Sequence, residues 1–257
     1  MAGLAEFTRS CLRGWKHGDR RMFRSLTLLV IMVLLGAPCA VVLLPFTMIT
    51  GNAGPLYNTS MWILRVAFRM ARIHVQVEGA EHVPAHTACV FMANHVSNLD
   101  PAALFPRIPG RTSAFLKRSL TRIPVLGSGL KLGDFVPVDR DGRVESAVES
   151  VAAARQVLER GLHITTFVEG TRSRDGRLLP FKKGPFYLAM EAEAPCVPVS
   201  IYGTETMMPK GSARIRSGTA HIVFHEPLDP RQFATREDLM EAMRTAIASG
   251  LPERMRG

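Results

Sequence analysis

His95 and Asp100 are the first residues in the chain whose types and spacing suggest chemistry. They begin and end a polar stretch that follows an apolar run and precedes Pro101. Histidine can act as a general base near neutral pH, and a nearby carboxylate can set its tautomer and stabilise the imidazolium. Five residues turn through roughly 500° on an ideal α-helix, which leaves side chains about 140° apart. The sequence therefore predicts that a strand ends in a turn that brings His95 to Asp100.

Asp100 also has a purely structural interpretation. An aspartate before a proline at the first helical position is a common helix start, so Asp100 could simply cap a helix that begins at Pro101. The residues alone leave both roles open, and one side chain can fulfil both.

Three further blocks follow this stretch in order. They are 133–140 (Gly-Asp-Phe-Val-Pro-Val-Asp-Arg), 167–173 (Phe-Val-Glu-Gly-Thr-Arg-Ser) and 197–201 (Val-Pro-Val-Ser-Ile). With His-x4-Asp in front, the order resembles the four-block pattern of the glycerolipid acyltransferases, the PlsC-type 1-acylglycerol-3-phosphate acyltransferases. The resemblance covers residues 73–228. One position departs from it, because Val168 stands where the third block usually has proline.

The resemblance implies roles for residues in the first two blocks. His95 would be the general base, and Asp100 would orient its ring. Arg140 matches the arginine that binds the acceptor's phosphate, and a guanidinium can hold a phosphate through two charge-assisted hydrogen bonds. A surface arginine paired with a neighbouring aspartate is the alternative. Lys117, at the end of another predicted strand, is a candidate second phosphate contact.

The third and fourth blocks are assigned in the same way. The family associates the third block with acceptor recognition and site organisation, which implies substrate-binding roles for Glu169, Gly170, Thr171 and Arg172. The glycine would let backbone amides approach a ligand closely. The family associates the fourth block, 197–201, with the acyl-donor side, and the block is interpreted as site architecture, although Pro198 could be an ordinary edge-strand or bulge proline.

The composition excludes several classes of protein. The 257 residues are 47% hydrophobic, enough for the core of one catalytic domain. The net charge of +10 indicates an anionic partner. Aromatic residues make up only 7% and no zinc-finger spacing occurs, which argues against a nucleic-acid-binding protein. The four cysteines lie far apart and are interpreted as reduced thiols. No metal site and no cofactor is predicted.

Residues 1–72 are predicted to form a helical segment that associates with a membrane. Six basic residues within the first 24 precede a stretch, 25–64, that has no charge. Its apolar part is long enough to cross a membrane, but Pro38 and Pro45 are expected to interrupt it. Because basic residues flank both ends, a hairpin that dips into one leaflet is favoured over a single span. The part after residue 55 is expected to be an interfacial helix, and a cleaved signal peptide is disfavoured.

Residues 73–257 are predicted to form an α/β domain, a mostly parallel sheet flanked by helices. Short apolar runs predict strands at 73–77, 88–93, 113–116, 135–138, 164–168 and 197–201. Periodic segments predict helices at 101–105, 144–158, 184–191 and 238–248. The segments 213–215 and 220–224 are expected to pair as a hairpin.

These features predict an acyltransferase at the cytoplasmic face of a plasma or inner membrane. It would move a fatty acyl group from acyl-CoA or acyl carrier protein to the 2-hydroxyl of 1-acylglycerol-3-phosphate, forming phosphatidic acid. The expected partners are that donor, a lyso-phospholipid acceptor and membrane phospholipids. Two alternatives stay open: another acceptor, such as lyso-ornithine lipid or glycerol-3-phosphate, and a non-enzymatic membrane protein that binds anionic lipid.

Overall fold

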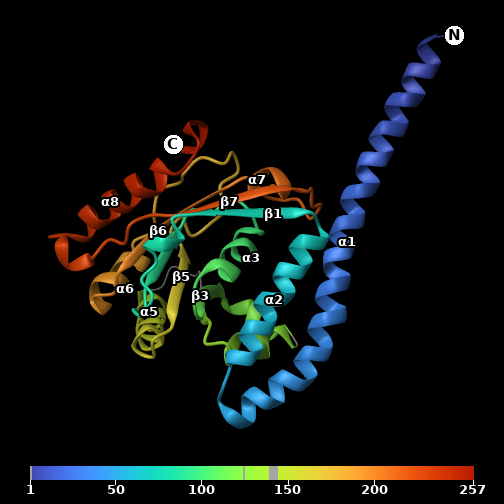
Figure 1. The fold of residues 1–257 in the computed structure, drawn as a ribbon. Coiled ribbons are helices and arrows are strands. Elements are labelled where there is room, and N and C mark those ends of the chain that lie inside the picture. Colours follow the sequence, from blue (N-terminus) through green and yellow to red (C-terminus); the bar gives the residue numbers. More distant parts are fainter. Residues whose placement is uncertain (1, 124, 139–143) are drawn as a thin grey trace.

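The computed structural model describes residues 2–123, 125–138 and 144–257 (Figure 1). Within these residues, seven strands form one sheet in the order β1-β7-β6-β2-β5-β3-β4. The strands are β1 (Ile73–Glu78), β2 (Val90–Ala93), β3 (Thr112–Lys117), β4 (Val136–Val138), β5 (His163–Phe167), β6 (Cys196–Tyr202) and β7 (Gly218–Phe224). The mostly parallel sheet predicted from the sequence is confirmed.

The direction of the strands decides where functional side chains can meet. The five strands β6, β2, β5, β3 and β4 are parallel, so their carboxyl ends share one edge of the sheet. β7 pairs antiparallel with β6 and parallel with β1. The predicted hairpin is therefore wrong: 213–215 is not a strand, and β7 takes the long strands β6 and β1 as partners, which pair over more residues than a three-residue strand could.

Helices cover both faces of the sheet. They are α1 (Ala2–Thr50), α2 (Gly54–Met70), α3 (Asp100–Leu104), α4 (Leu126–Leu132), α5 (Val144–Glu159), α6 (Gly184–Ala192), α7 (Thr204–Met207) and α8 (Arg236–Ser249). Side chains alternate along β2, so Phe91 packs with α2 and α3 whereas Val90 and Met92 pack with α5, α6 and α8. The site is thus built on a central strand that is buried on both faces.

Local sequence explains where the surface helix α8 begins. Thr235 precedes it with extended backbone and accepts a hydrogen bond from the Asp238 backbone N–H. The Asp238 carboxylate accepts one from the Thr235 backbone N–H in return, which completes a capping box. Leu239, Met243 and Ile247 then recur every four residues and are fully buried against the sheet.

The N-terminal helix α1 continues through both of its prolines, so the expected interruption at Pro38 and Pro45 is wrong. Each proline removes one backbone hydrogen bond, but an apolar helix tolerates this loss because breaking the helix would expose more unpaired backbone groups. Within the described residues, one stretch is long and apolar enough to cross a membrane, Ser25–Thr50, and it is almost wholly unburied. The hairpin in the membrane stays a prediction.

α2 runs back beside α1 and packs on the sheet (Figure 1). The expectation of an interfacial helix is wrong for part of it, because Ile63, Ala67 and Phe68 are buried. The Tyr57 hydroxyl also accepts a hydrogen bond from the Thr112 backbone N–H at 3.3 Å, at the start of β3. α2 is amphipathic, and the buried side chains of its apolar face pack against the rest of the protein. The domain boundary at residue 72 stays a prediction.

Candidate active site

Asn94 carries the chain out of β2 and fixes where the catalytic turn begins. Its side-chain amide donates to the Ile201 carbonyl at 2.8 Å, and its side-chain oxygen accepts from the Ile201 backbone N–H at 2.7 Å. Asn94 is buried, so these two bonds satisfy polar atoms that water cannot reach. They join the end of β2 to β6 and place His95 at the carboxyl edge of the sheet.

His95 and Asp100 meet as the spacing predicts. The His95 Nδ1 atom lies 2.8 Å from Asp100 Oδ2, and the same oxygen accepts the backbone N–H groups of Val96 at 2.7 Å and Ser97 at 2.8 Å. The Asp100 side chain is fully buried, whereas that of His95 is 17% exposed. The carboxylate therefore folds the turn and contacts the ring at once.

The capping interpretation of Asp100 is wrong. α3 begins at Asp100, yet the hydrogen-bond partners of its carboxylate within the described residues all lie outside this helix. The carboxylate points back to residues 95–97, because three donors converge there on one oxygen.

The geometry determines the tautomer of the His95 ring. A carboxylate oxygen accepts hydrogen bonds, so Nδ1, which faces Asp100 Oδ2, is the nitrogen that carries the proton in the neutral ring. Nε2 then holds the lone pair and lies on the side of the ring away from Asp100. The ring also stacks on Phe167 of β5, with centroids 4.1 Å apart and planes 23° from parallel. The ring is thus held in one orientation by Asp100 and Phe167.

Thr204 holds the second oxygen of Asp100, and sequence reasoning missed it. Its buried hydroxyl donates to Asp100 Oδ1 at 2.5 Å across 104 residues of sequence. The chain reaches this point by a tight turn at Gly203, whose φ is +91°. A Cβ at Gly203 would lie 2.3 Å from the Thr219 carbonyl oxygen, so only glycine fits. Gly203 is the sequence feature that could have indicated a turn here, but a glycine does not indicate that the next residue contacts Asp100.

Glu169 contacts the backbone of His95. Its Oε1 accepts the His95 backbone N–H at 2.8 Å, and its Oε2 accepts that of Leu179 at 3.1 Å. The Ser173 backbone N–H donates to the His95 carbonyl at 2.8 Å. The turn at 169–173 therefore holds the peptide groups on both sides of His95, and the Glu169 side chain is buried there.

Burial raises the pKa of the Glu169 carboxyl to about 7. The hydrogen bonds from His95 and Leu179 act in the opposite direction, since they favour the ionised form, but the loss of hydration outweighs them. Near neutral pH this carboxyl is therefore partly protonated at the position where it accepts the His95 backbone N–H.

We expect this shift to appear in the stability of the protein. The folded state binds the Glu169 proton more tightly than the unfolded chain, so its contribution is full below about pH 4.5 and is lost as pH rises through about 7. Relative to Glu169→Gln, the wild-type free energy of unfolding should fall over this window by on the order of 2–3 kcal/mol. Chemical denaturation in detergent at several pH values measures it. The surface variant Glu191→Gln should follow the wild-type slope; equal slopes for wild type and Glu169→Gln would contradict the shift.

Comparison with known proteins assigns the chain to a family. The sequence model of the acyltransferase family matches residues 74–202, half of the chain. The chain belongs to the acyltransferase family. This confirms the resemblance carried by the four blocks.

Individual relatives are named for one activity. A Brassica napus protein, "1-acyl-sn-glycerol-3-phosphate acyltransferase BAT2, chloroplastic", is 34% identical over 68% of this chain and 50% of its own length. Human "1-acyl-sn-glycerol-3-phosphate acyltransferase alpha" is 28% identical over 78% and 70%. The crystal structure of "the 1-acyl-sn-glycerophosphate (LPA) acyltransferase, PlsC, from Thermotoga maritima" superposes with a TM-score of 0.76 at 25% identity, covering 91% of this chain and 97% of that one. The chain spans half to two thirds of the length of several of the curated relatives that it matches.

The other residues of the third block, 170–172, form a turn that Lys210 contacts. Gly170 has a φ of +68°, and a Cβ there would lie 3.0 Å from the Lys182 side chain. Thr171 is exposed and Arg172 is half-buried. Lys210, which the sequence reasoning also missed, donates to the Arg172 carbonyl at 2.6 Å and lies 3.4 Å from the Thr171 hydroxyl. The substrate-binding roles of Glu169, Gly170, Thr171 and Arg172 stay predictions.

Lys117, one of the two predicted phosphate contacts, lies farther along the sheet. Lys117 is exposed at the carboxyl end of β3, which β5 separates from β2. Arg140 lies outside the described residues, and β4 ends two residues before it.

Pro198 lies in β6, between β7 and β2, so the edge-strand interpretation of this proline is wrong.

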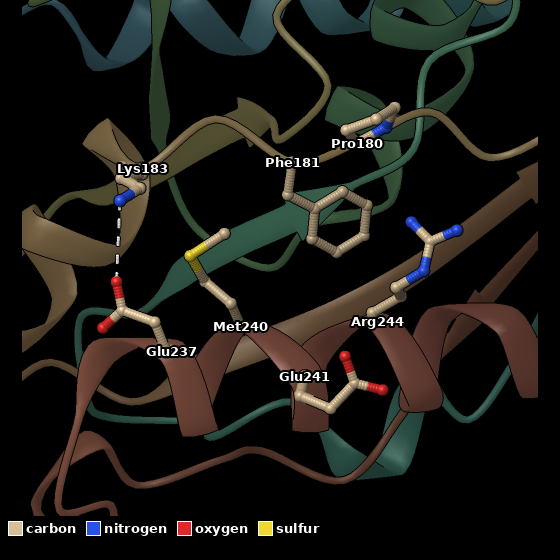
Figure 2. Close-up of a pocket in the computed structure, with 7 residues that line it drawn as sticks. All are labelled: Pro180, Phe181, Lys183, Glu237, Met240, Glu241 and Arg244. Atoms are coloured by element: carbon tan, nitrogen blue, oxygen red, sulfur yellow. Dashed lines mark ion pairs between the residues drawn. The ribbon is translucent and has the colours of Figure 1, made fainter.

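A hollow lies at α8 and is lined by residues outside the four blocks. Figure 2 shows its lining residues: Pro180, Phe181, Lys183, Glu237, Met240, Glu241 and Arg244. Two basic and two acidic side chains share it, and Lys183 already lies 3.7 Å from Glu237. Arg244 donates to the Leu179 carbonyl at 3.2 Å. The hollow contains no residue of the turn at 94–100.

Proposed function

We propose that the protein transfers a fatty acyl group from an acyl thioester to the 2-hydroxyl of 1-acylglycerol-3-phosphate, which forms phosphatidic acid. The observation that carries this proposal is the His95 ring, fixed by Asp100 and Phe167 with Nε2 free, in a chain of the acyltransferase family. The names of the relatives support the acceptor.

The chemistry needs one proton transfer and one displacement. Nε2 of His95 takes the proton of the acceptor hydroxyl as its oxygen attacks the thioester carbonyl carbon. The C–S bond then breaks, and the thiolate leaving group takes the proton back from the imidazolium. The buried Asp100 carboxylate stabilises the imidazolium between these steps.

Direct transfer in a ternary complex is favoured over an acyl-enzyme. The Ser97 hydroxyl donates to the Met208 carbonyl at 2.8 Å, and the Ser173 hydroxyl donates to Asp175 at 2.9 Å. Both serines are buried and already bonded, so neither presents a free nucleophile beside His95.

The decisive test is the acceptor dependence of the purified protein. Thioester consumption with acyl-CoA or acyl carrier protein is measured with 1-acylglycerol-3-phosphate, lyso-ornithine lipid or glycerol-3-phosphate as acceptor. The proposal expects the first to be used best, since it has both a phosphate and a chain. An equal rate with a phosphate-free lyso-lipid would contradict the acceptor, and no consumption with any of them would contradict the activity.

Arg140 is the proposed phosphate ligand. Arg140→Ala should lower kcat/KM for 1-acylglycerol-3-phosphate about tenfold to a hundredfold, because charge-assisted hydrogen bonds to the phosphate are lost. Saturation by the acyl donor should change little. Arg155→Ala is the matched control, since Arg155 pairs with Glu159 on the exposed face of α5. An unchanged acceptor dependence in Arg140→Ala would exclude this role.

Membrane attachment through α1 is part of the proposal. The unburied apolar stretch Ser25–Thr50 supports it, and the basic residues on both sides favour the cytoplasmic face. An acceptor that already carries one acyl chain would then meet the enzyme at the bilayer surface.

A further inference from the structure

Four large apolar side chains are exposed between the end of β3 and the first turn of α4. They are Leu120, Ile123, Val125 and Leu126, here named the apolar tip, and each is at least 39% exposed. Scattered exposed apolar residues are ordinary, but four within seven positions indicate a contact surface. Val125 also has a φ of +64°, an unfavourable backbone conformation for a β-branched residue. Such strain is typical of sites kept for function.

The apolar tip lies next to the apolar part of α1. α4 follows it directly and packs on α1, where a Cβ at Gly129 would lie 3.9 Å from Leu44. In Figure 1 the light-green segment after β3 lies beside the lower half of α1 and the start of α2. The tip therefore extends the unburied apolar surface of Ser25–Thr50 onto the catalytic domain.

The charge around the tip indicates the chemistry of the surface it meets. Residues 101–133 contain six basic residues and no acidic one. Lys117 and Lys131 are exposed on either side of the tip, and Arg122 is exposed within it. An apolar centre with basic flanks matches the boundary between the acyl chains and the headgroups of an anionic bilayer.

We propose that the apolar tip is a second membrane contact, inserted beside α1 into a bilayer that contains anionic phospholipid. A second copy of the chain is a poorer occupant, because its tip would bring the same basic residues into the interface. β3 is parallel to β2 and ends at Lys117, just before the tip, so insertion holds the His95 edge against the lipid surface. For the acyl transfer proposed above, on which this consequence alone depends, the acceptor would reach His95 without leaving the bilayer.

The test places a fluorophore at matched valines in the full-length chain. Val125→Cys reports on the tip, and Val148→Cys on α5 is the control, since these valines are 55% and 62% exposed. Leu34→Cys on α1 is the reference for the bilayer. Cys11 and Cys39 are first replaced by serine, whereas Cys89 and Cys196 are buried and stay. Each labelled protein is reconstituted into vesicles of phosphatidylcholine and phosphatidylglycerol with brominated acyl chains.

The expected result is that bromine quenches the labels at 125 and 34 by about half or more and leaves the label at 148 nearly unquenched, because interfacial segments enter about 5–10 Å. An unquenched label at 125 would overturn the proposal, as would equal quenching at 125 and 148. A blue-shifted label at 125 without vesicles, lost on dilution, would assign the tip to self-association and also overturn it. Acyl transfer by the same samples tests the proposed function separately, since quenching requires no turnover.

Discussion

Replacing His95 by alanine should abolish acyl transfer while the protein stays folded. Nε2 of His95 has no substitute at the carboxyl edge of β2, and loss of a general base typically lowers the rate by about 10² to 10⁴. The ring contributes a stacking contact with Phe167 but is partly exposed, so we expect a small change in stability. Single-turnover rates with saturating donor and acceptor measure the effect.

His86→Ala is the matched control for this experiment. His86 is exposed in the loop before β2 and lies outside the motif blocks, so its variant should keep wild-type turnover. A well-folded His95→Ala protein with near-normal turnover would exclude the proposed mechanism and favour a lipid-binding role without catalysis.

Asp100→Asn should lower kcat almost as strongly, by about 10² to 10⁴, and should leave the fold intact. The amide oxygen can take the place of Oδ2 and accept the Val96 and Ser97 backbone N–H groups. The amide nitrogen would face Thr204, whose hydroxyl can turn from donor to acceptor. What the substitution removes is the negative charge that stabilises the His95 imidazolium.

Asp100→Ala separates the structural role from the chemical one. This variant leaves two buried backbone N–H groups without acceptors, which costs about 1–3 kcal/mol each. Thermal unfolding should therefore show a large loss of stability for Asp100→Ala and a small one for Asp100→Asn. If Asp100→Asn kept wild-type kcat, the carboxylate would be a structural group only.

The catalytic turn could be predicted because its information is local. His95 and Asp100 are five residues apart, and a polar stretch between an apolar run and Pro101 restricts how the chain can turn. The alternating apolar runs likewise predicted the parallel part of the sheet, since each strand and helix depends mainly on its own pattern. The prediction of a hairpin at 213–224 was wrong because strand pairing depends on long-range contacts, and β7 pairs with β6 and β1.

The roles of Glu169 and Thr204 could not be read from the sequence. Glu169 lies 74 residues from His95, and its motif suggests substrate contact, whereas the folded carboxylate holds the His95 backbone. Thr204 contacts Asp100 only because β6 lies beside β2 and the chain turns back at Gly203. Such contacts depend on strand order, which a local pattern does not contain.

The sequence by itself therefore determined which chemical groups this protein carries: a His–Asp pair, basic residues that we propose for an anionic acceptor, and a long apolar segment near a basic N-terminus. These depend on residue type and short spacing. The tertiary structure decided which groups orient that chemistry and which apolar faces stay unburied. α2 buries Phe68 against the sheet, while α1 and the tip around Val125 keep apolar side chains exposed. Each of these segments carries large apolar side chains, and packing distinguishes the face buried in the core from the surface that we propose meets lipid.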